Sequence, residues 1–451
     1  MTYEYDKDLF SKEQQDYIDK AIENNAEKEL LDIMTLTDKD NNPVFDVPRL
    51  YNFYMATLYR YSIDSIKICG QLNKEGKPMF NTGQIKNILE AASSLSSEQL
   101  DFLLKVNKEG NPIYNEFHMK EIISGFNSGL SIEDVKFYAK LSSNDVPIYN
   151  SLVMKAIKDD MVIRMDKEKI LLYAKLNNNN EEMIYPHGIW QAIRDDIRDG
   201  YSEEKIGLYA ALDENQNLIF TKAQVSEIRI GLIYEMPKEK IEIFANPKFN
   251  PKQITDIREF LFKANDEQCK QIKKCIKEKM KYNKFKILLN PNLSADKIRI
   301  LKSIKLLDYS DECIKKLIDN KYSYEDLKEI KYLIQCTDKL IGRNNIDRYL
   351  DLDVDEFKYS LSYDICMNNK IDILARSTIE KCIDYKMTPE EISFIINSDF
   401  SVEEMRYVSV AILAGASFNE IKENHKLAQS VLGDETIPTN FKTDFDIIKE
   451  K

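Results

Sequence analysis

The feature that most constrains this chain is an aromatic residue that recurs about every 35 residues along its first half. The spacings between successive members are 35, 35, 34, 35, 36 and 35 residues. A fixed period of this length indicates one supersecondary unit stacked on the next. These residues, termed the anchors, are Phe10, Phe45, Phe80, Tyr114, Tyr149, Tyr185 and Phe220.

Each anchor is followed by the pattern of a helical hairpin. Apolar residues such as Ile85 and Ile88 stand five and eight positions after the anchor, which is the spacing of one helix face. Sixteen or seventeen positions after the anchor comes a residue suited to open a second helix. Ser and Asp accept a hydrogen bond from first-turn amides, and Pro has no amide that needs a partner. The predicted starts of second helices are Ser62, Ser96, Ser131, Asp166, Ser202 and Pro237.

The second helix carries its own apolar stripe, as in Val135 with Tyr138. Gly129 and Gly200 share one offset from their anchors and are predicted to form the turn between the two helices. Sequences rich in Asn, Asp and Gly, such as NKEGNPIY, precede the next anchor and predict loops. The chain is therefore predicted to be all-α, an α-solenoid or superhelix of two-helix repeats of about 35 residues.

After residue 250 the hairpin pattern continues, but its period shortens and varies. Phe249 leads to a cap-like Asp266 that is predicted to open a second helix, and Leu374 is predicted to be an anchor. Ser323 and Asp326 resemble a capping box before an apolar run. We predict a regular array over 1–248, irregular helical repeats with a basic segment over 249–350, C-terminal helical repeats over 351–432, and a loosely ordered tail over 433–451.

In the length of its unit the chain resembles the α-solenoids of the tetratricopeptide size class, over most of its length. It lacks that family's signature of Trp, Leu-Gly and Pro, so neither membership nor the family's peptide-binding residues are carried over. Pentatricopeptide repeats have a similar length and bind single-stranded RNA, one base per repeat. A net charge of −12 argues against that activity here. The resemblance implies stacked repeats with an extended binding surface.

Composition agrees with a folded, helical protein. Only 13 glycines and 12 prolines occur in 451 residues, which is few for a protein of many strands. The first residues, MTYEYDKDLF, lack the regions of a secretory signal, so a cytoplasmic location is expected. The seven cysteines form no CxxC pair and are expected to be reduced thiols buried in helices. Abundant Lys, Asn, Ile and Glu are typical of AT-rich bacterial or phage coding.

Charge is distributed unevenly along the chain. Residues 270–350 carry 20 basic and 11 acidic side chains, whereas the segments on either side are acidic. Lysines at helical spacing within this segment are predicted to line one helix, opposite a buried stripe of Cys269, Ile272, Ile276 and Met280. Such a surface either binds phosphates or an acidic protein or is a solvated helix face. The lysines are Lys270, Lys273, Lys274, Lys277, Lys281 and Lys284.

The sequence contains no recognisable catalytic or metal-binding constellation. His118, His187 and His425 are far apart and in no metal-ligand spacing. Glycine-rich phosphate loops and the GxSxG nucleophile elbow are absent from the sequence. Neighbouring acids such as Asp195 and Asp196 are interpreted as helix-surface or first-turn residues. The chain is predicted not to be an enzyme and to use no cofactor, and a carboxylate pair placed by the fold is the remaining catalytic alternative.

The predicted architecture favours a non-enzymatic scaffold or adaptor whose helical-repeat surface holds a protein partner. The alternative is binding of nucleic acid or a ribonucleoprotein through the basic segment 270–286. That alternative includes a phage or mobile-element protein that inhibits a nucleic-acid enzyme. No membrane contact is expected.

Overall fold

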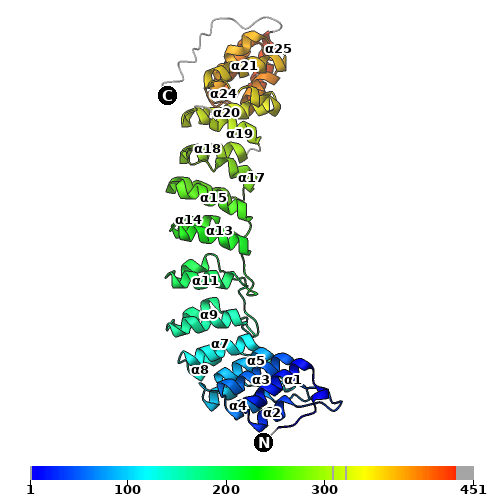
Figure 1. Cartoon of the computed structure of the whole chain (residues 1–451). Coiled ribbons are helices and arrows are strands. Elements are labelled where there is room, and N and C mark those ends of the chain that lie inside the picture. Colours follow the sequence, from blue (N-terminus) through cyan, green and yellow to red (C-terminus); the bar gives the residue numbers. More distant parts are fainter. Residues whose placement is uncertain (1–2, 307–308, 320–321, 433–451) are drawn as a thin grey trace. The chain divides into compact units, whose positions relative to one another are not determined.

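The computed structural model describes residues 3–306, 309–319 and 322–432, and the regular structure within these ranges is helical, without a β-strand (Figure 1). The chain forms two compact units, 1–230 and 231–451, and the division falls within helix α13. The first unit contains, in chain order, η1 (Lys7–Leu9), α1 (Lys12–Glu23), α2 (Lys28–Met34), α3 (Val47–Tyr59), α4 (Ile63–Cys69), α5 (Thr82–Ala91), α6 (Ser97–Leu103), α7 (Glu116–Asn127), α8 (Ile132–Tyr138), α9 (Ser151–Val162), α10 (Lys167–Tyr173), α11 (Ile189–Arg198), α12 (Glu203–Gly207) and most of α13 (Lys222–Ile233).

The second unit begins in the last turn of α13. Its described elements are α14 (Lys238–Phe244), α15 (Pro251–Lys263), α16 (Asp266–Lys277), α17 (Tyr282–Phe285), η2 (Lys286–Leu288), α18 (Ala295–Leu306), α19 (Asp311–Asp319), α20 (Tyr324–Leu340), η3 (Arg343–Arg348), α21 (Val354–Asn369), η4 (Ile373–Ala375), α22 (Arg376–Asp384), α23 (Pro389–Asn397), α24 (Val402–Leu413) and α25 (Phe418–Leu432). None of these helices, nor any described helix of the first unit, is long and apolar enough to cross a lipid bilayer. The predicted tail, 433–451, lies outside the described residues.

The predicted helix starts are confirmed in the regular part of the chain. All six residues predicted to open second helices are the N-caps of α4, α6, α8, α10, α12 and α14. In α4 the Ser62 hydroxyl accepts a hydrogen bond from the amide of Ser65. Six first helices, α1, α3, α5, α7, α9 and α13, begin two residues after an anchor, whereas α11 begins four residues after Tyr185. In α5 Asn81 and Gln84 form a reciprocal capping box. Such caps satisfy amides that have no partner within the helix, each worth about 1 kcal/mol.

The apolar positions predicted for each hairpin form its core. All seven anchors are buried, and the residues five and eight positions after the anchors from Phe45 to Phe220 are buried as well. In the second helices Tyr138, Tyr173 and Tyr209 have no exposed surface. First helices pack in chain order, α1 on α3, α3 on α5, α5 on α7 and α7 on α9, as Figure 1 shows. Each pair therefore covers an apolar face that a single hairpin would leave in water.

Polar side chains make the same contacts at equivalent positions of successive helical hairpins. The hydroxyls of Tyr114, Tyr149 and Tyr185 each donate to the carbonyl oxygen of an alanine 25 residues later, at 3.1, 2.8 and 3.1 Å. Gln84 in a first helix donates from Nε2 to the carbonyl oxygen of the next anchor, Tyr114, at 2.7 Å. The tyrosine contact joins the two ends of one helical hairpin, and the glutamine contact joins one hairpin to the next.

The six loops before the anchors from Phe45 to Phe220 are small hairpins, and each is closed by an isolated antiparallel bridge. In one of them Asn73 Oδ1 accepts hydrogen bonds from the amides of Glu75 and Lys77, at 3.0 and 3.1 Å. Gly76 in the same loop has a φ of 77°, which glycine adopts without steric cost. The Asn and Gly residues of these sequences thus form the turns that they predict.

The prediction that Asp266 opens a second helix is wrong. Asn265 is the N-cap of α16, and Asp266 is the first residue of that helix. Gln268 of α16 donates from Nε2 to the carbonyl oxygen of Leu293 at 2.6 Å. Gln84 of the first helix α5 makes the equivalent contact with the carbonyl oxygen of Tyr114. Because α15 is followed directly by another helix with this contact, the order of first and second helices changes here. Periodicity alone did not show this change.

Two predictions for the second unit have opposite outcomes. The capping box between Ser323 and Asp326 is confirmed at the start of α20. Leu374 is not an anchor: it lies in η4 and is 69% exposed, whereas the next residue, Ala375, is fully buried. The short helix η4 packs against α21, α22 and α24, and this packing decides which of its side chains is covered.

Candidate functional site

The six lysines predicted to form one surface lie on two helices. Lys270, Lys273, Lys274 and Lys277 are exposed on α16, whereas Lys281 is the exposed N-cap of α17 and Lys284 is half-buried within α17. The prediction of one continuous helix is wrong because α16 ends in a tight turn. The amides of Lys279 and Met280 donate to the carbonyl oxygens of Ile276 and Cys275 at 3.0 Å each, and Lys279 has a φ of 57°. This pattern terminates a helix and returns an apolar residue to its side.

The lysines of α16 are mostly without acidic partners. Lys270 pairs with Glu267 at 2.6 Å. Lys273, Lys274 and Lys277 form no ion pair among the described residues. The opposite side of the helix is buried, as predicted, although Ile276 is only half-buried. The helix therefore presents an exposed cationic face.

Buried ion pairs, which the sequence did not predict, connect successive first helices of the first unit. In chain order they are Lys158 on α9 with Glu121 on α7, Arg194 on α11 with Asp160 on α9, and Arg229 on α13 with Asp196 on α11. Asp160 and Asp196 are only 0% and 2% exposed. The interpretation of Asp196 as a surface acid is wrong because an arginine of the next first helix covers it, whereas Asp195 is exposed as predicted.

Asp160 has two arginine partners. The Tyr173 hydroxyl and Arg194 Nε both donate to Asp160 Oδ2 at 2.7 Å. Arg198 Nε donates to Oδ1 at 2.9 Å. Within the described part of the chain, the equivalent carboxylate on α11, that of Asp196, has one arginine partner, Arg229. The Asp160 cluster therefore carries more positive than negative charge.

The charges of this cluster are fixed near neutral pH. Burial raises the pKa of the Asp160 carboxyl, but hydrogen bonds from Arg194, Tyr173 and Arg198 lower it by more, so this pKa lies below its ordinary value. Burial and the hydrogen bond to Asp160 raise the pKa of Tyr173. Asp160 thus stays ionised and Tyr173 stays neutral, which suits a structural role better than proton transfer.

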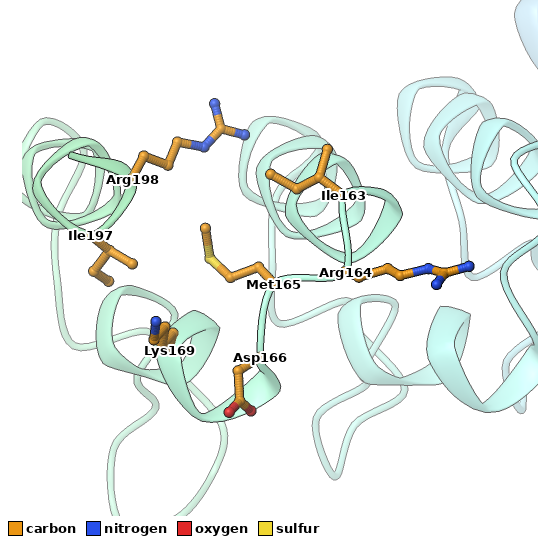
Figure 2. A pocket seen from close by; sticks show the side chains of 7 residues that line it. All are labelled: Ile163, Arg164, Met165, Asp166, Lys169, Ile197 and Arg198. Carbon is orange, nitrogen blue, oxygen red and sulfur yellow. The ribbon is translucent and has the colours of Figure 1, made fainter. Parts of the chain in front are cut away.

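A hollow of about 700 Å³ opens beside this cluster, at the turn between α9 and α10. In Figure 2 Met165 points toward its centre between Arg198 and Lys169, and Arg164 points away. Ile163, at the rim, is 64% exposed. The hollow combines apolar side chains with positive charge. This hollow, termed the Ile163 hollow, is lined by Ile163, Arg164, Met165, Asp166, Lys169, Ile197 and Arg198.

A second hollow, of about 830 Å³, lies between the second helices α8 and α10. Two of its lysines have acidic partners: Lys136 pairs with Glu133 at 2.5 Å and Lys167 pairs with Asp134 outside the hollow at 2.8 Å. Its other two lysines have no ion pair among the described residues. The lining of this hollow, termed the α8–α10 groove, is Glu133, Lys136, Phe137, Lys140, Tyr149, Lys167, Glu168, Leu171, Leu172, Lys175, Leu176 and Asn180.

An exposed apolar patch lies in the second unit where α13 and α15 end. Its members Ile233, Tyr234 and Phe262, termed the turn patch, are 58%, 59% and 57% exposed. The rings of Tyr234 and Phe262 are in contact, with centroids 5.8 Å apart. Tyr59 and Ile163 follow their anchors by the same 14 residues as Tyr234 and are also exposed. The patch was not predicted, although two apolar residues just before a turn were a visible signal.

Helix α21 carries a second exposed apolar surface. Tyr359, Tyr363 and Met367 follow one another at intervals of four residues and are 53%, 42% and 57% exposed. The Arg376 guanidinium lies 4.2 Å from the centroid of the Tyr359 ring. Residues four apart share one face of a helix, so α21 presents this stripe along its length.

The described residues contain no group of three or more His, Cys, Asp or Glu placed to hold a metal ion. The cysteines are buried, as predicted, and burial raises the pKa of the Cys275 thiol to about 11. Such a thiol is protonated near neutral pH and reacts poorly. His118 is half-buried, and burial lowers its pKa. His187 contacts Trp190, with ring centroids 6.0 Å apart.

No family model, curated protein or solved structure matches this chain.

Proposed function

We propose that the chain is an α-solenoid of helical hairpins that binds a protein partner and catalyses no reaction. Support for the repeated architecture comes from contacts that recur at equivalent positions. The anchor hydroxyls, the Gln84 contact and the ion pairs between first helices are examples. Stacked hairpins of this kind present extended surfaces that suit a macromolecular ligand.

The observation that carries the proposed protein partner is the turn patch. Single exposed apolar residues are common, but contiguous exposed aromatic surface is typical of interaction sites. Tyr234 and Phe262 contact each other although each residue is more than half exposed. Aromatic residues are enriched at protein interfaces because they bury a large area with few rotatable bonds. The stripe on α21 has the same character.

Photo-crosslinking tests this proposal. A photoreactive phenylalanine analogue placed at Tyr234 or at Phe262 is expected to capture a protein in a lysate of the cells that express this chain. The captured species should be sensitive to protease and resistant to nuclease. Replacing both aromatic residues by serine should lower the yield from the analogue at Ile233, because the apolar contact is lost.

The matched control places the same analogue at Ser128, which is exposed and stands at the offset of Tyr234 from its own anchor. Capture from the turn patch that does not exceed capture from Ser128 would contradict the proposal. A captured species that nuclease digests would also contradict it, in favour of the second candidate.

The second candidate function is nucleic-acid binding through the basic segment 270–286, favoured by the exposed lysines of α16 that form no ion pair among the described residues. Reversal of Lys273, Lys274, Lys277 and Lys281 to Glu is then expected to abolish binding of a single-stranded oligonucleotide. The wild-type affinity should fall steeply with salt, because each lysine that neutralises a phosphate releases a counterion. Fluorescence anisotropy measures both effects. Equal affinity of the wild type and the reversed variant would eliminate this candidate.

A further inference from the structure

We propose that the α8–α10 groove binds an acidic segment of a partner protein that also carries apolar side chains. The groove is distinct from the turn patch and lies within the first unit. The inference rests on the proposed function, because it names the chemistry of one segment of the protein partner.

The apolar part of the groove suits leucine or aromatic side chains of such a segment. Leu171 of α10 is 45% exposed although it lies beside the half-buried Leu172 and Phe137. Tyr149 contributes a buried ring to the lining. Covering Leu171 and its neighbours would remove apolar area from water, which favours binding. The volume of about 830 Å³ is sufficient for several side chains.

The charged part of the groove argues for acidic groups. Residues 1–230 contain 27 basic and 38 acidic side chains, a net charge of −11. The lining of the groove has the opposite balance, with four lysines and two glutamates. The excess of lysine attracts acidic ligands to the groove, whereas the net negative charge of the rest of the unit repels them.

Two of these lysines stand at equivalent positions. Lys140 and Lys175 are 35 residues apart, and each follows the last residue of its helix by two positions. Both are exposed and form no ion pair among the described residues. A pair of unpartnered ammonium groups on neighbouring hairpins can hold two carboxylates along one bound segment.

The lining favours a peptide over a nucleic acid. Binding of single strands uses aromatic rings on which bases stack. The groove offers leucines instead, and the ring of Phe137 has the Lys167 ammonium 5.4 Å from its centroid. Apolar side chains of a peptide fit this surface, whereas bases would have no free ring to stack on.

Selection from a random peptide library displayed on phage tests the inference with the full-length chain. The wild type is expected to enrich sequences that combine Asp or Glu with Leu or Phe. The variant Lys140→Glu with Lys175→Glu should lose this enrichment. Its affinity for the selected peptides, measured by fluorescence anisotropy, should fall at least about tenfold because two attractions become repulsions.

The matched control is Lys120→Glu with Lys155→Glu. These lysines are also exposed, form no ion pair among the described residues and are 35 residues apart, but they lie on the first helices α7 and α9. The control should bind the selected peptides within about twofold of the wild type, because screening weakens distant charges. Circular dichroism checks that both variants remain folded.

Three outcomes would overturn the inference: selection of basic or uncharged sequences, equal losses in both variants, or unchanged binding by the groove variant. Binding of an oligonucleotide that only the groove variant loses would assign the site to nucleic acid instead. Failure here leaves capture from the turn patch intact, so it is distinguishable from failure of the proposed function.

Discussion

Replacing Asp160 by asparagine is expected to destabilise the first unit by about 3 to 5 kcal/mol, the range for removing one partner of a buried ion pair. The substitution keeps the shape of the side chain but removes its charge. Arg194 and Arg198 then lose the carboxylate that both contact, and Tyr173 loses its carboxylate acceptor. Because α9 and α11 are joined by this cluster, the contact between two successive first helices is weakened as well.

Urea unfolding followed by circular dichroism measures this loss. Asp199→Asn is the matched control, since Asp199 is exposed and forms no ion pair among the described residues. The control should change the free energy of unfolding by less than about 0.5 kcal/mol, as surface substitutions usually do. A loss below about 1 kcal/mol for Asp160→Asn would mean that the cluster contributes little to stability.

The stabilisation by the Asp160 carboxylate should decrease only toward acid pH. The folded pKa of Asp160 lies below the ordinary value of 3.8 because the hydrogen bonds outweigh the effect of burial. A carboxylate with a lowered pKa contributes its full stabilisation above the ordinary value and loses it as the pH falls through the folded pKa. The stability difference between the wild type and Asp160→Asn should therefore be constant near neutral pH and narrow below about pH 4.

The helices of the first unit were predictable from sequence because their signals are local. A cap such as Ser62 and an apolar pair such as Ile85 and Ile88 act within a few residues. The end of α16 at Lys277 was missed because the turn at Lys279 and Met280 lies within a spacing that still looks helical. Leu374 was misplaced because packing against α21, α22 and α24, which the spacing of apolar residues does not give, decides which residue of η4 is buried.

The binding surfaces were less predictable for the same reason. Lysine spacing showed that α16 has a cationic face, but the α8–α10 groove needs side chains from two helices whose approach the sequence does not give. Asp196 and Asp195 are adjacent acids with opposite exposure, and only the position of Arg229 on the next first helix distinguishes them. The sequence shows how far Asp195 and Asp196 lie from their anchor, but which of them is buried depends on packing between successive hairpins.

Gly125→Ala is expected to destabilise the first unit although alanine favours helices. A Cβ atom at Gly125 would lie 2.1 Å from the Tyr138 hydroxyl oxygen and 3.2 Å from Cζ. Tyr138 is fully buried, and its hydroxyl donates to the carbonyl oxygen of Glu121 at 3.1 Å, so the ring cannot move away without losing that bond. Overpacking of this kind costs about 1 to 3 kcal/mol, more than the gain of about 1 kcal/mol from replacing glycine within a helix.

The same relation recurs in the second unit, where a Cβ at Gly231 would lie 2.7 Å from Cζ of Phe244. Gly207→Ala is the control, because no atom lies within 4 Å of its added Cβ, and it should be neutral or stabilising by about 0.5 to 1 kcal/mol. Combining Gly125→Ala with Tyr138→Phe removes the oxygen that clashes and should recover part of the lost stability. Urea unfolding of the single and double variants tests this coupling. Strictly additive losses would show that the tyrosine hydroxyl is not what requires glycine at position 125.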